Sequence, residues 1–244
     1  MTRYFLEFSY KGTAFHGLQL QPEGITIQGE INKALSIILK QEVQTTVSSR
    51  TDAGVHAKQN FVHLDLEQAW NPKLLYNANA IIHPDIVLKH MTAVEPDQHA
   101  RFDAVARSYS YHIITHKNPF LRDFAYYFPF ALDRLKMEEA TKLLFEYHDF
   151  ESFSKKHTDV HTFQCTLSEA RWEFLPAEIV FHVTSNRFLR GMVRALVATL
   201  LLVGRRKISI PEFKDIIERK DCTLADFSAE AKGLFLEKVH YPFI

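Results

Sequence analysis

Apolar and polar residues alternate with two different periods along this chain, and the periods predict where its elements lie. Behind Thr26, whose side chain can cap a first turn, apolar residues recur at positions 27, 31, 35 and 38, the spacing of one helix face. We therefore predict a helix over residues 26–40. The same analysis predicts strands over 3–10, 43–49, 59–66 and 85–94, and a helix over 71–82 that Asn71 caps with Pro72 at its first position.

The remainder of the chain repeats this theme. We predict strands over 107–115 and near 124–129, a helix opened by Asp133, two strands between 163 and 185, a helix over 187–203, a helix opened by Ser209, and a closing strand over 233–241. Strands that run alongside helices favour an α+β fold over an alternating parallel sheet. We place a boundary near residues 103–107, which gives two domains, 1–104 and 105–244.

Composition is that of an ordinary soluble protein. The 244 residues are 46% hydrophobic and 24% charged, and Cys165 and Cys222 lie far apart, without a metal-type or redox-type spacing. This cysteine usage suits a reducing cytoplasm. The N-terminus alternates like a strand rather than a signal peptide, and the apolar run 195–204 is about half of the ~20 residues that cross a bilayer. We expect a cytoplasmic protein with no membrane segment.

The net charge does not change the interpretation of an ordinary soluble protein, but one local cluster of basic residues does. The 29 basic and 29 acidic residues give a net charge of +0, which offers no support for a nucleic-acid partner. Between positions 187 and 207, however, there are six basic residues and no acidic one: Arg187, Arg190, Arg194, Arg205, Arg206 and Lys207. A solvated helix face with a basic last turn is the alternative. Arg194 fits that alternative poorly, because its apolar neighbours imply a carboxylate or phosphate partner for its charge.

The segment RTDAGVHA, residues 50–57, displays one carboxylate, Asp52, between an arginine and an Ala-Gly turn. Gly54 permits backbone angles that other residues avoid and lets a substrate approach closely. Arg50 can pair with Asp52 or bind a phosphate. The segment lies between two β-rich runs, so we expect a loop held by a sheet. The alternative is a hairpin in which Asp52 only caps its own turn.

Thirteen histidines raise the question of a metal site. His157 and His161 lie four residues apart with Asp159 between them, a spacing that would suit metal ligands on a helix. The surrounding residues are typical of a polar loop and no third ligand is evident, so we expect no metal. For His56 and His63 we expect structural hydrogen bonds rather than acid-base catalysis.

The segment RTDAGVHA resembles the signature of the TruA family of tRNA pseudouridine synthases. Five further segments, one before it and four after it, also match in the family's order: FSYKGTAFHGLQLQ (8–21), NANAIIHPDI (77–86), HARFDAVARSYSY (99–111), NRFLRGMVR (186–194) and GLFLEKVHYP (233–242). The resemblance extends from Tyr4 to Pro242. It implies two related halves, each with a mostly antiparallel sheet flanked by helices, that meet at a central active-site cleft.

The resemblance also implies roles for individual residues. Asp52 would be the catalytic carboxylate, Arg194 its cationic partner, and Tyr109 the aromatic side chain that stacks on the target base. By its family position, Leu234 would line the base pocket. As candidates for phosphate contacts we take Arg50, Arg101 and the predicted helix arginines Arg187 and Arg190. Asp52 could attack the ribose, attack the base, or remove a proton from the sugar, and the sequence leaves these routes open. For Tyr109 alone, core packing is the alternative.

The implied substrate is the anticodon stem-loop of tRNA at positions 38 to 40, modified by a homodimer without any cofactor. Two alternatives from other classes are a noncatalytic or re-targeted RNA-binding relative and a metal-dependent hydrolase. The chain departs from the family's usual residues at Leu18, Ser49, His83 and Ala195. None of these departures affects Asp52, Tyr109 or Arg194.

Overall fold

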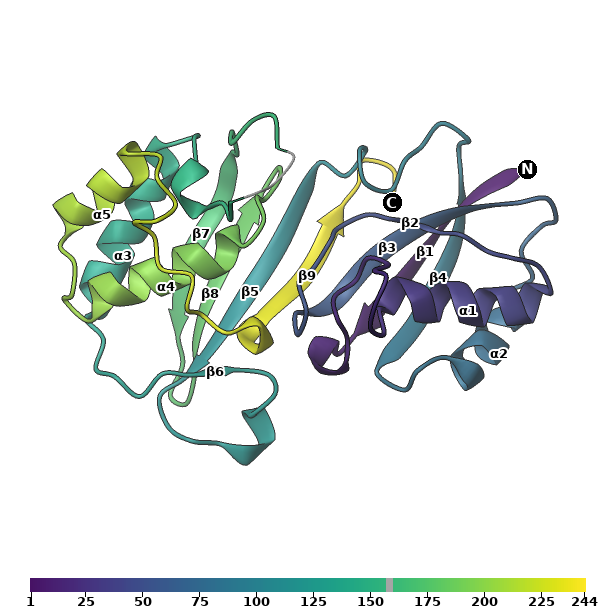
Figure 1. Cartoon of the computed structure of the whole chain (residues 1–244), viewed down its shortest axis with the longest axis horizontal. Helices are drawn as coiled ribbons and strands as arrows, with labels where there is room; N and C mark the ends of the chain where they lie inside the picture. The colour runs from purple at the N-terminus through teal and green to yellow at the C-terminus, as the bar shows by residue number, and fades with distance from the viewer. Residues whose placement is uncertain (157–159) are drawn as a thin grey trace. The chain divides into compact units, whose positions relative to one another are not determined.

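The computed structural model describes residues 1–156 and 160–244. They form two compact units (Figure 1). Unit 1 consists of Met1–Val105 together with Phe235–Ile244, and unit 2 consists of Ala106–Leu234. The last ten residues thus fold with the N-terminal part of the chain.

Unit 1 is built around strand β1 (Thr2–Tyr10), which pairs antiparallel with β3 (His56–Leu66) on one side and with β4 (Ile86–Val94) on the other. The short strand β2 (Thr46–Val47) pairs antiparallel with β3, and β9 (Leu234–His240) pairs parallel with the start of β3. Helix α2 (Lys73–Ile81) contacts β4 and also α1 (Ile27–Leu39). Both helices lie beside these strands in Figure 1.

An aromatic cluster explains why the C-terminal segment belongs to unit 1. The rings of Phe5 and Phe61 each lie 5.3 Å from the ring of Tyr241 in edge-on geometry. The Tyr241 hydroxyl donates to Ser48 Oγ at 2.7 Å and also contacts the carbonyl of Ala100. Burial of three aromatic rings and a satisfied hydroxyl therefore fixes the chain end against β1 and β3.

Unit 2 is built on three antiparallel strands in the order β5 (Ala106–Ile114), β8 (Ile179–Ser185) and β7 (Leu167–Phe174). The short β6 (Tyr126–Tyr127) pairs parallel with β5. The helices of this unit are α3 (Arg134–Leu143), α4 (Met192–Gly204) and α5 (Ile210–Glu218) (Figure 1). Short 3-10 helices in the chain are Gly12–Ala14, Pro119–Leu121, Leu144–Glu146, Glu151–Phe153 and Ala231–Gly233.

Helix α4 is the buried helix of unit 2, which explains the apolar run 195–204. Eleven of its residues are buried, including polar Thr199, whose hydroxyl donates to the Ala195 carbonyl at 2.8 Å. A helix that is apolar on nearly every side belongs in a protein core when it is too short for a bilayer. Among the described residues, no helix is long and apolar enough to span a membrane.

Three of the four helix starts predicted from capping residues are confirmed. The fourth helix, α2, begins one residue later than predicted, at Lys73 with Pro72 as its N-cap residue, although Asn71 Oδ1 accepts the backbone N–H of Lys73 at 3.1 Å. Thr26 Oγ1 accepts from the backbone N–H of Gly29 at 3.2 Å, and Asp133 Oδ1 accepts from that of Lys136 at 3.1 Å. Ser209 forms a reciprocal capping box with Glu212. Each cap satisfies an N–H group that the first helical turn leaves without a partner.

Three predicted elements were wrong in extent. The strands predicted over 43–49 and 124–129 are only the two-residue β2 and β6. The helix predicted over 187–203 begins at Met192, because Gly191 adopts φ +78°, a left-handed conformation that interrupts helical backbone. Arg187 and Arg190 therefore precede α4 and do not share a helix face with Arg194.

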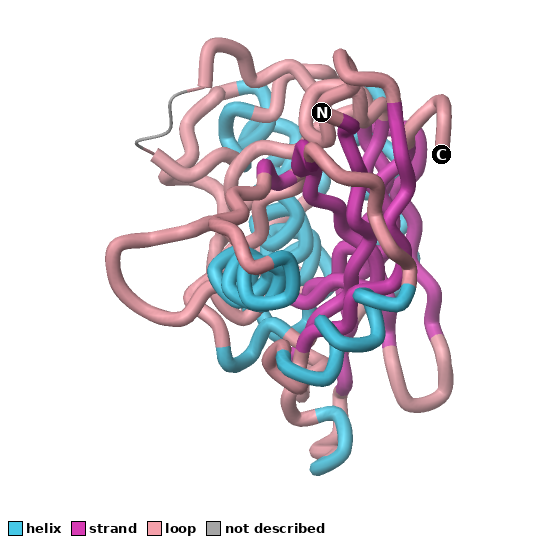
Figure 2. The backbone as a smooth tube through the Cα atoms, turned by 90° about the vertical axis from the view of Figure 1, so that its right-hand side faces the viewer, coloured by secondary structure: helices cyan, strands magenta, loops and turns pink. Residues whose placement is uncertain are grey.

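The α+β class is confirmed. The described residues form five α-helices and nine strands, and most strand pairs are antiparallel. Figure 2 shows the helices in cyan and the strands in magenta. A kinship between the two halves stays a prediction.

Candidate active site

Asp52 lies in a tight turn between β2 and β3, in a loop (residues 48–55) that we call the Asp52 loop. The backbone N–H of Val55 donates to the Asp52 carbonyl at 3.2 Å and closes the turn. Gly54 has φ +79°, the value that a turn with a left-handed third residue requires. Ala53 at the tip is exposed, and the Asp52 side chain is half-buried. Asp52 is thus held by ordered backbone and remains partly accessible to solvent.

Three hydrogen bonds from residues outside the Asp52 loop hold its two arms, which are the residues on either side of Arg50. The Tyr10 hydroxyl lies 2.7 Å from Thr51 Oγ1, and the backbone N–H of Leu18 donates to the Thr51 carbonyl at 3.2 Å. On the preceding arm, Asn60 Nδ2 donates to the Ser49 carbonyl at 2.9 Å. The residue directly before Asp52 is therefore fixed through both its side chain and its carbonyl.

Two glycines allow a neighbouring segment to pack directly on the Asp52 loop. A Cβ at Gly12 would lie 1.9 Å from the Val55 carbonyl oxygen. Gly17 has φ +96°, and a Cβ there would lie 3.0 Å from the Thr51 carbonyl oxygen. Neither position has room for a larger side chain without movement of the Asp52 loop, so these glycines set the distance between the two segments.

His56, the next residue after the Asp52 loop, has the structural role predicted for it. It is 1% exposed, and its Nδ1 accepts the backbone N–H of Gly12 at 3.0 Å. Its ring stacks on Phe235 with centroids 4.6 Å apart. An Nδ1 that accepts a hydrogen bond carries no proton, so His56 is held in its neutral form with the proton on Nε2.

His63 is likewise structural. Its Nδ1 accepts the backbone N–H of Ala100 at 3.1 Å, and its ring meets that of His99 edge-on at 4.6 Å. Burial, together with the charges of His99 and Arg3, lowers the pKa of His63 to about 4. His63 is therefore neutral near neutral pH and supports the segment that carries Arg101.

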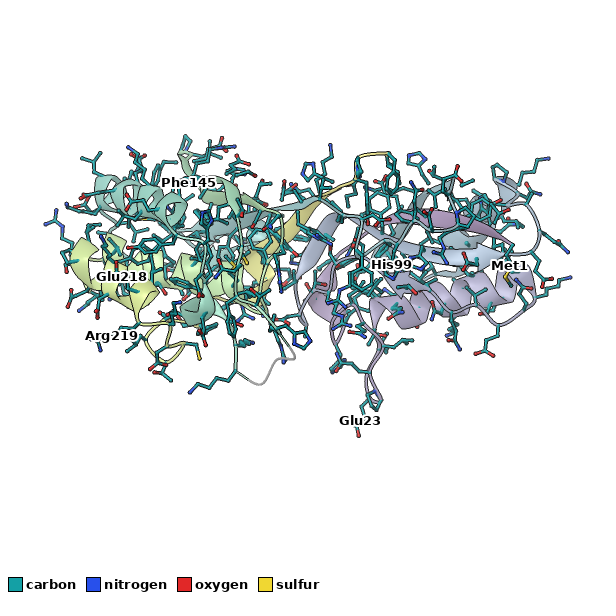
Figure 3. All side chains as sticks on the ribbon, turned by 90° about the horizontal axis from the view of Figure 1, so that it is seen from above. Met1, Glu23, His99, Phe145, Glu218 and Arg219 are labelled. Carbon is teal, nitrogen blue, oxygen red and sulfur yellow. The ribbon has the colours of Figure 1, made fainter. Side chains whose placement is uncertain are left out.

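Arg101 lies in a turn that His99 and Asp103 organise (Figure 3 labels His99). The backbone N–H of His99 donates to Asp103 Oδ2 at 2.7 Å, and that of Arg101 donates to His99 Nδ1 at 3.1 Å. The side chains of Arg101 and Arg50 are both exposed. Two cations of unit 1 are thus accessible to an anionic partner.

In unit 2, Tyr109 lies in the middle of β5, opposite Val183 of β8. Its side chain is 8% exposed, and its ring meets Phe188 edge-on at 5.0 Å. Tyr111 is fully buried, and its hydroxyl donates to the Glu230 carbonyl at 2.7 Å. Tyr111 is therefore a core residue. Leu234, the first residue of β9, is 7% exposed.

Arg194 lies in the first turn of α4 and is half-buried. Its Nε donates to the Ala229 carbonyl at 2.6 Å, so a backbone carbonyl is one partner of this charge, where the sequence led us to expect a carboxylate or phosphate. The charge of Arg194 also lowers the pKa of Tyr111, against the larger effect of burial, which raises it. The guanidinium is therefore close to the Tyr111 side of β5.

The other cations of the 187–207 cluster fall into two groups. Arg190 is exposed and Arg187 half-buried, and the Arg190 carbonyl accepts the backbone N–H of Lys155 at 3.0 Å. At the far end of α4, Arg206 pairs with Asp133 at 2.8 Å and Arg205 lies over the ring of Phe130 at 3.8 Å. The solvated basic helix end, the alternative to RNA binding, therefore describes Arg205 and Arg206 well.

The predicted site residues divide between the two units. Unit 1 carries Arg50, Asp52 and Arg101, and unit 2 carries Tyr109, Arg187, Arg190, Arg194 and Leu234. Arg50 and Asp52 share one loop.

His157 and Asp159, whose spacing with His161 raised the question of a metal site, lie outside the described residues. Within the described ranges, no group of three or more His, Cys, Asp or Glu side chains is arranged to hold a metal ion. Both cysteines are free thiols, and burial raises the pKa of Cys165 to about 11.

Comparison with known proteins defines first the class of protein. Residues 140–242 match the family model described as tRNA pseudouridine synthase. Full-length relatives extend the match over the remaining residues.

The chain is 45% identical to tRNA pseudouridine synthase A of Bacteroides thetaiotaomicron, over 99% of this chain and 91% of that protein. It is 44% identical to the enzyme of the same name from Porphyromonas gingivalis, over 99% and 98%. For that of Staphylococcus saprophyticus the identity is 38%, over 98% and 90%. The chain belongs to the tRNA pseudouridine synthase A family, whose members are isomerases.

Proposed function

We propose that this chain converts uridine to pseudouridine in the anticodon stem-loop of tRNA, at positions 38 to 40, with Asp52 as the catalytic carboxylate. The observation that carries this proposal is the setting of Asp52. A half-buried carboxylate follows a residue fixed by two hydrogen bonds and precedes an exposed turn tip. Catalytic groups need such a fixed backbone together with access for the substrate.

The reaction balances within the substrate itself. The bond between N1 of uracil and C1′ of ribose breaks, the base turns, and a bond forms between C5 and C1′. C5 loses one proton and N1 gains one, so no electron, phosphate or hydride is exchanged. The reaction therefore requires no cofactor. Asp52 serves as nucleophile toward the ribose or the base, or as base toward the sugar.

Arg194 and Tyr109 complete the proposed catalytic group. Arg194 is the cationic partner of the Asp52 carboxylate, and Tyr109 stacks on the target base, with Leu234 lining the base pocket. Stacking on an aromatic ring contributes ~1 to 3 kcal/mol per base. Extruding a base from a helix costs a few kcal/mol, so contacts to the RNA backbone must supply the rest.

The proposed backbone contacts are the arginines that flank the catalytic group. Arg50 and Arg101 are exposed on unit 1, and Arg190 is exposed on unit 2 beside half-buried Arg187. Guanidinium groups bind phosphates in bidentate geometry. Local clusters of this kind bind RNA even though the net charge of the chain is +0.

The proposed assembly is a homodimer in which one tRNA contacts both subunits. Within one chain, we propose that domains 1–104 and 105–244 are related halves whose sheets meet at a cleft containing Asp52, Tyr109 and Arg194. A tRNA substrate also implies that the enzyme works in the cytoplasm.

The test is pseudouridine mapping of tRNA transcripts incubated with the purified protein and with its Asp52→Asn variant. We expect pseudouridine at positions 38 to 40 with the wild-type protein and none with the variant. Product at other uridines would overturn the proposed target, and product formed by the Asp52→Asn variant would overturn the role of Asp52.

A further inference from the structure

Tyr10 is the last residue of β1 and ends in the protein interior beside the Asp52 loop. Its side chain is 5% exposed, and its ring stacks on Phe8 with centroids 5.8 Å apart. The strand pairing between β1 and β3 shifts its register between Phe8 and Tyr10. This irregularity re-aims the side chain at the strand end. The Tyr10 hydroxyl thereby reaches Thr51 Oγ1 at 2.7 Å.

Thr51 is the residue that connects this contact to Asp52. Its carbonyl is already held by the backbone N–H of Leu18 at 3.2 Å. The hydroxyl contact with Tyr10 adds a second constraint on the other side of the same residue. Two constraints on one residue restrict rotation of the peptide that leads into Asp52 more than either constraint does alone.

The same tyrosine is connected to the other arm of the Asp52 loop. Interaction with the Asn60 side chain lowers the pKa of Tyr10 in part, and Asn60 Nδ2 donates to the Ser49 carbonyl at 2.9 Å. Asn60 and Ser49 are both buried. One hydroxyl therefore joins a polar network that holds the residues on both sides of Arg50.

Tyr10 is unsuited to move a proton itself. Burial raises its pKa to about 12, although interactions with Thr51 and Asn60 lower it in part. The phenol therefore stays neutral at any pH at which the protein is assayed. A role in orientation remains, and it requires only the hydroxyl.

We propose that Tyr10 is a positioning residue for the isomerisation: its hydroxyl, through Thr51 and Asn60, holds the Asp52 loop in the geometry that aims the Asp52 carboxylate at the substrate. This inference rests on the proposed catalytic role of Asp52. Displacing a reacting group by about 1 Å can reduce a rate ~100-fold. A network that limits such displacement therefore affects kcat more than substrate binding.

The first test compares Tyr10→Phe with Tyr4→Phe. Both tyrosines lie on β1, both are buried, and each loses one hydroxyl; that of Tyr4 accepts the backbone N–H of Trp70 at 3.0 Å. We expect Tyr10→Phe to lower kcat about tenfold or more, with KM for tRNA within about threefold of wild type. Tyr4→Phe should retain wild-type kcat while it shows a similar change in melting temperature.

The second test separates the positioning role of Tyr10 from an effect on general stability. Thr51→Val removes the partner hydroxyl and keeps the shape of the side chain, whereas Thr51→Ser keeps the hydroxyl. We expect Thr51→Val to lower kcat as Tyr10→Phe does, the double variant to lose little more than either single variant, and Thr51→Ser to restore most of the rate. The pH dependence of kcat should keep its shape in Tyr10→Phe, because a neutral phenol contributes no titration.

Three outcomes would overturn the inference. They are wild-type kcat in Tyr10→Phe, multiplicative losses in the double variant, and an equal loss of kcat in Tyr4→Phe. A failure of the underlying function is distinguishable, because it would appear as an active Asp52→Asn variant. An inactive Asp52→Asn variant beside a fully active Tyr10→Phe variant would reject only the positioning role.

Discussion

Replacing Gly17 by alanine should slow catalysis more than it destabilises the protein. Gly17 has φ +96°, and its Cα faces the Asp52 loop. An L-residue in the left-handed region costs ~1 to 2 kcal/mol. For a chain of this length, 1 kcal/mol shifts the melting temperature by about 2 to 4 °C. We therefore expect Gly17→Ala to melt about 2 to 8 °C below wild type.

The catalytic effect follows from a second contact. The new Cβ would lie 3.0 Å from the Thr51 carbonyl oxygen, so the carbonyl must retreat by a few tenths of an ångström. Since ~1 Å of misplacement costs up to ~100-fold in rate, a shift of this size should lower kcat about 3- to 10-fold. Pseudouridine formation under saturating tRNA measures kcat, and thermal unfolding measures stability.

Gly24→Ala is the matched control. Gly24 has φ +85°, so alanine suffers the same backbone strain, but its Cβ would meet the flexible side chain of His16 instead of the Asp52 loop. It lies next to Glu23 on a loop that projects from unit 1 (Figure 3). We expect a similar loss of melting temperature with unchanged kcat. Equal rates in the two variants would refute the reasoning that Gly17 positions the Asp52 loop.

Three further predictions concern charges. Arg194→Met should abolish activity and lower the melting temperature by several degrees, because a charged hydrogen bond to the Ala229 carbonyl contributes ~1.5 to 3 kcal/mol. An unchanged melting temperature would contradict the expected loss of stability. The double variant Arg187→Gln with Arg190→Gln should weaken tRNA binding. The slope of log affinity against log salt concentration should fall by about 0.7 to 0.9 for each phosphate contact that is lost. An unchanged slope would place the RNA elsewhere. The pKa of His63 is lowered from 6.5 to about 4, so the unfolded state binds more protons between these values, and stability should fall as pH falls from about 6.5 to 4. Unfolding measured across this range should show a shallower fall in His63→Asn, and an equally steep fall would remove His63 as its source.

Local signals were sufficient to predict where three of the helices begin. Thr26, Asp133 and Ser209 cap helices where the sequence predicted them, because a cap depends on residues within one turn of it. The start of α4 was wrong for a related reason. Phe188 and Leu189 extend the apolar pattern ahead of the helix, but residues 187–189 have no regular structure and 190–191 form a turn in which Gly191 has a left-handed backbone. A glycine within a helical pattern fits either a helix interior or a break, so spacing alone does not distinguish them.

Within the candidate site, the sequence indicated the Asp52 loop but not what holds it. In the sequence, Tyr10 and Asn60 have the pattern of ordinary strand residues. Their contacts with Thr51 and Ser49 depend on the pairing of β1 with β3. Gly12 was the available signal in the sequence, since a glycine beside a strand often marks a place where another backbone segment approaches closely. Long-range packing of this kind follows from the completed fold and not from any single segment.

The role of Asp52 is tested most directly by measuring catalysis and binding on the same variant. Asp52→Ala removes one carboxylate from the turn and leaves the arginines that we propose to contact phosphates, so pseudouridine formation should cease while tRNA affinity stays within about tenfold of wild type. Single-turnover assays with saturating enzyme and filter binding at fixed salt give the two quantities. Pseudouridine formed by Asp52→Ala at a rate near that of wild type would contradict the account.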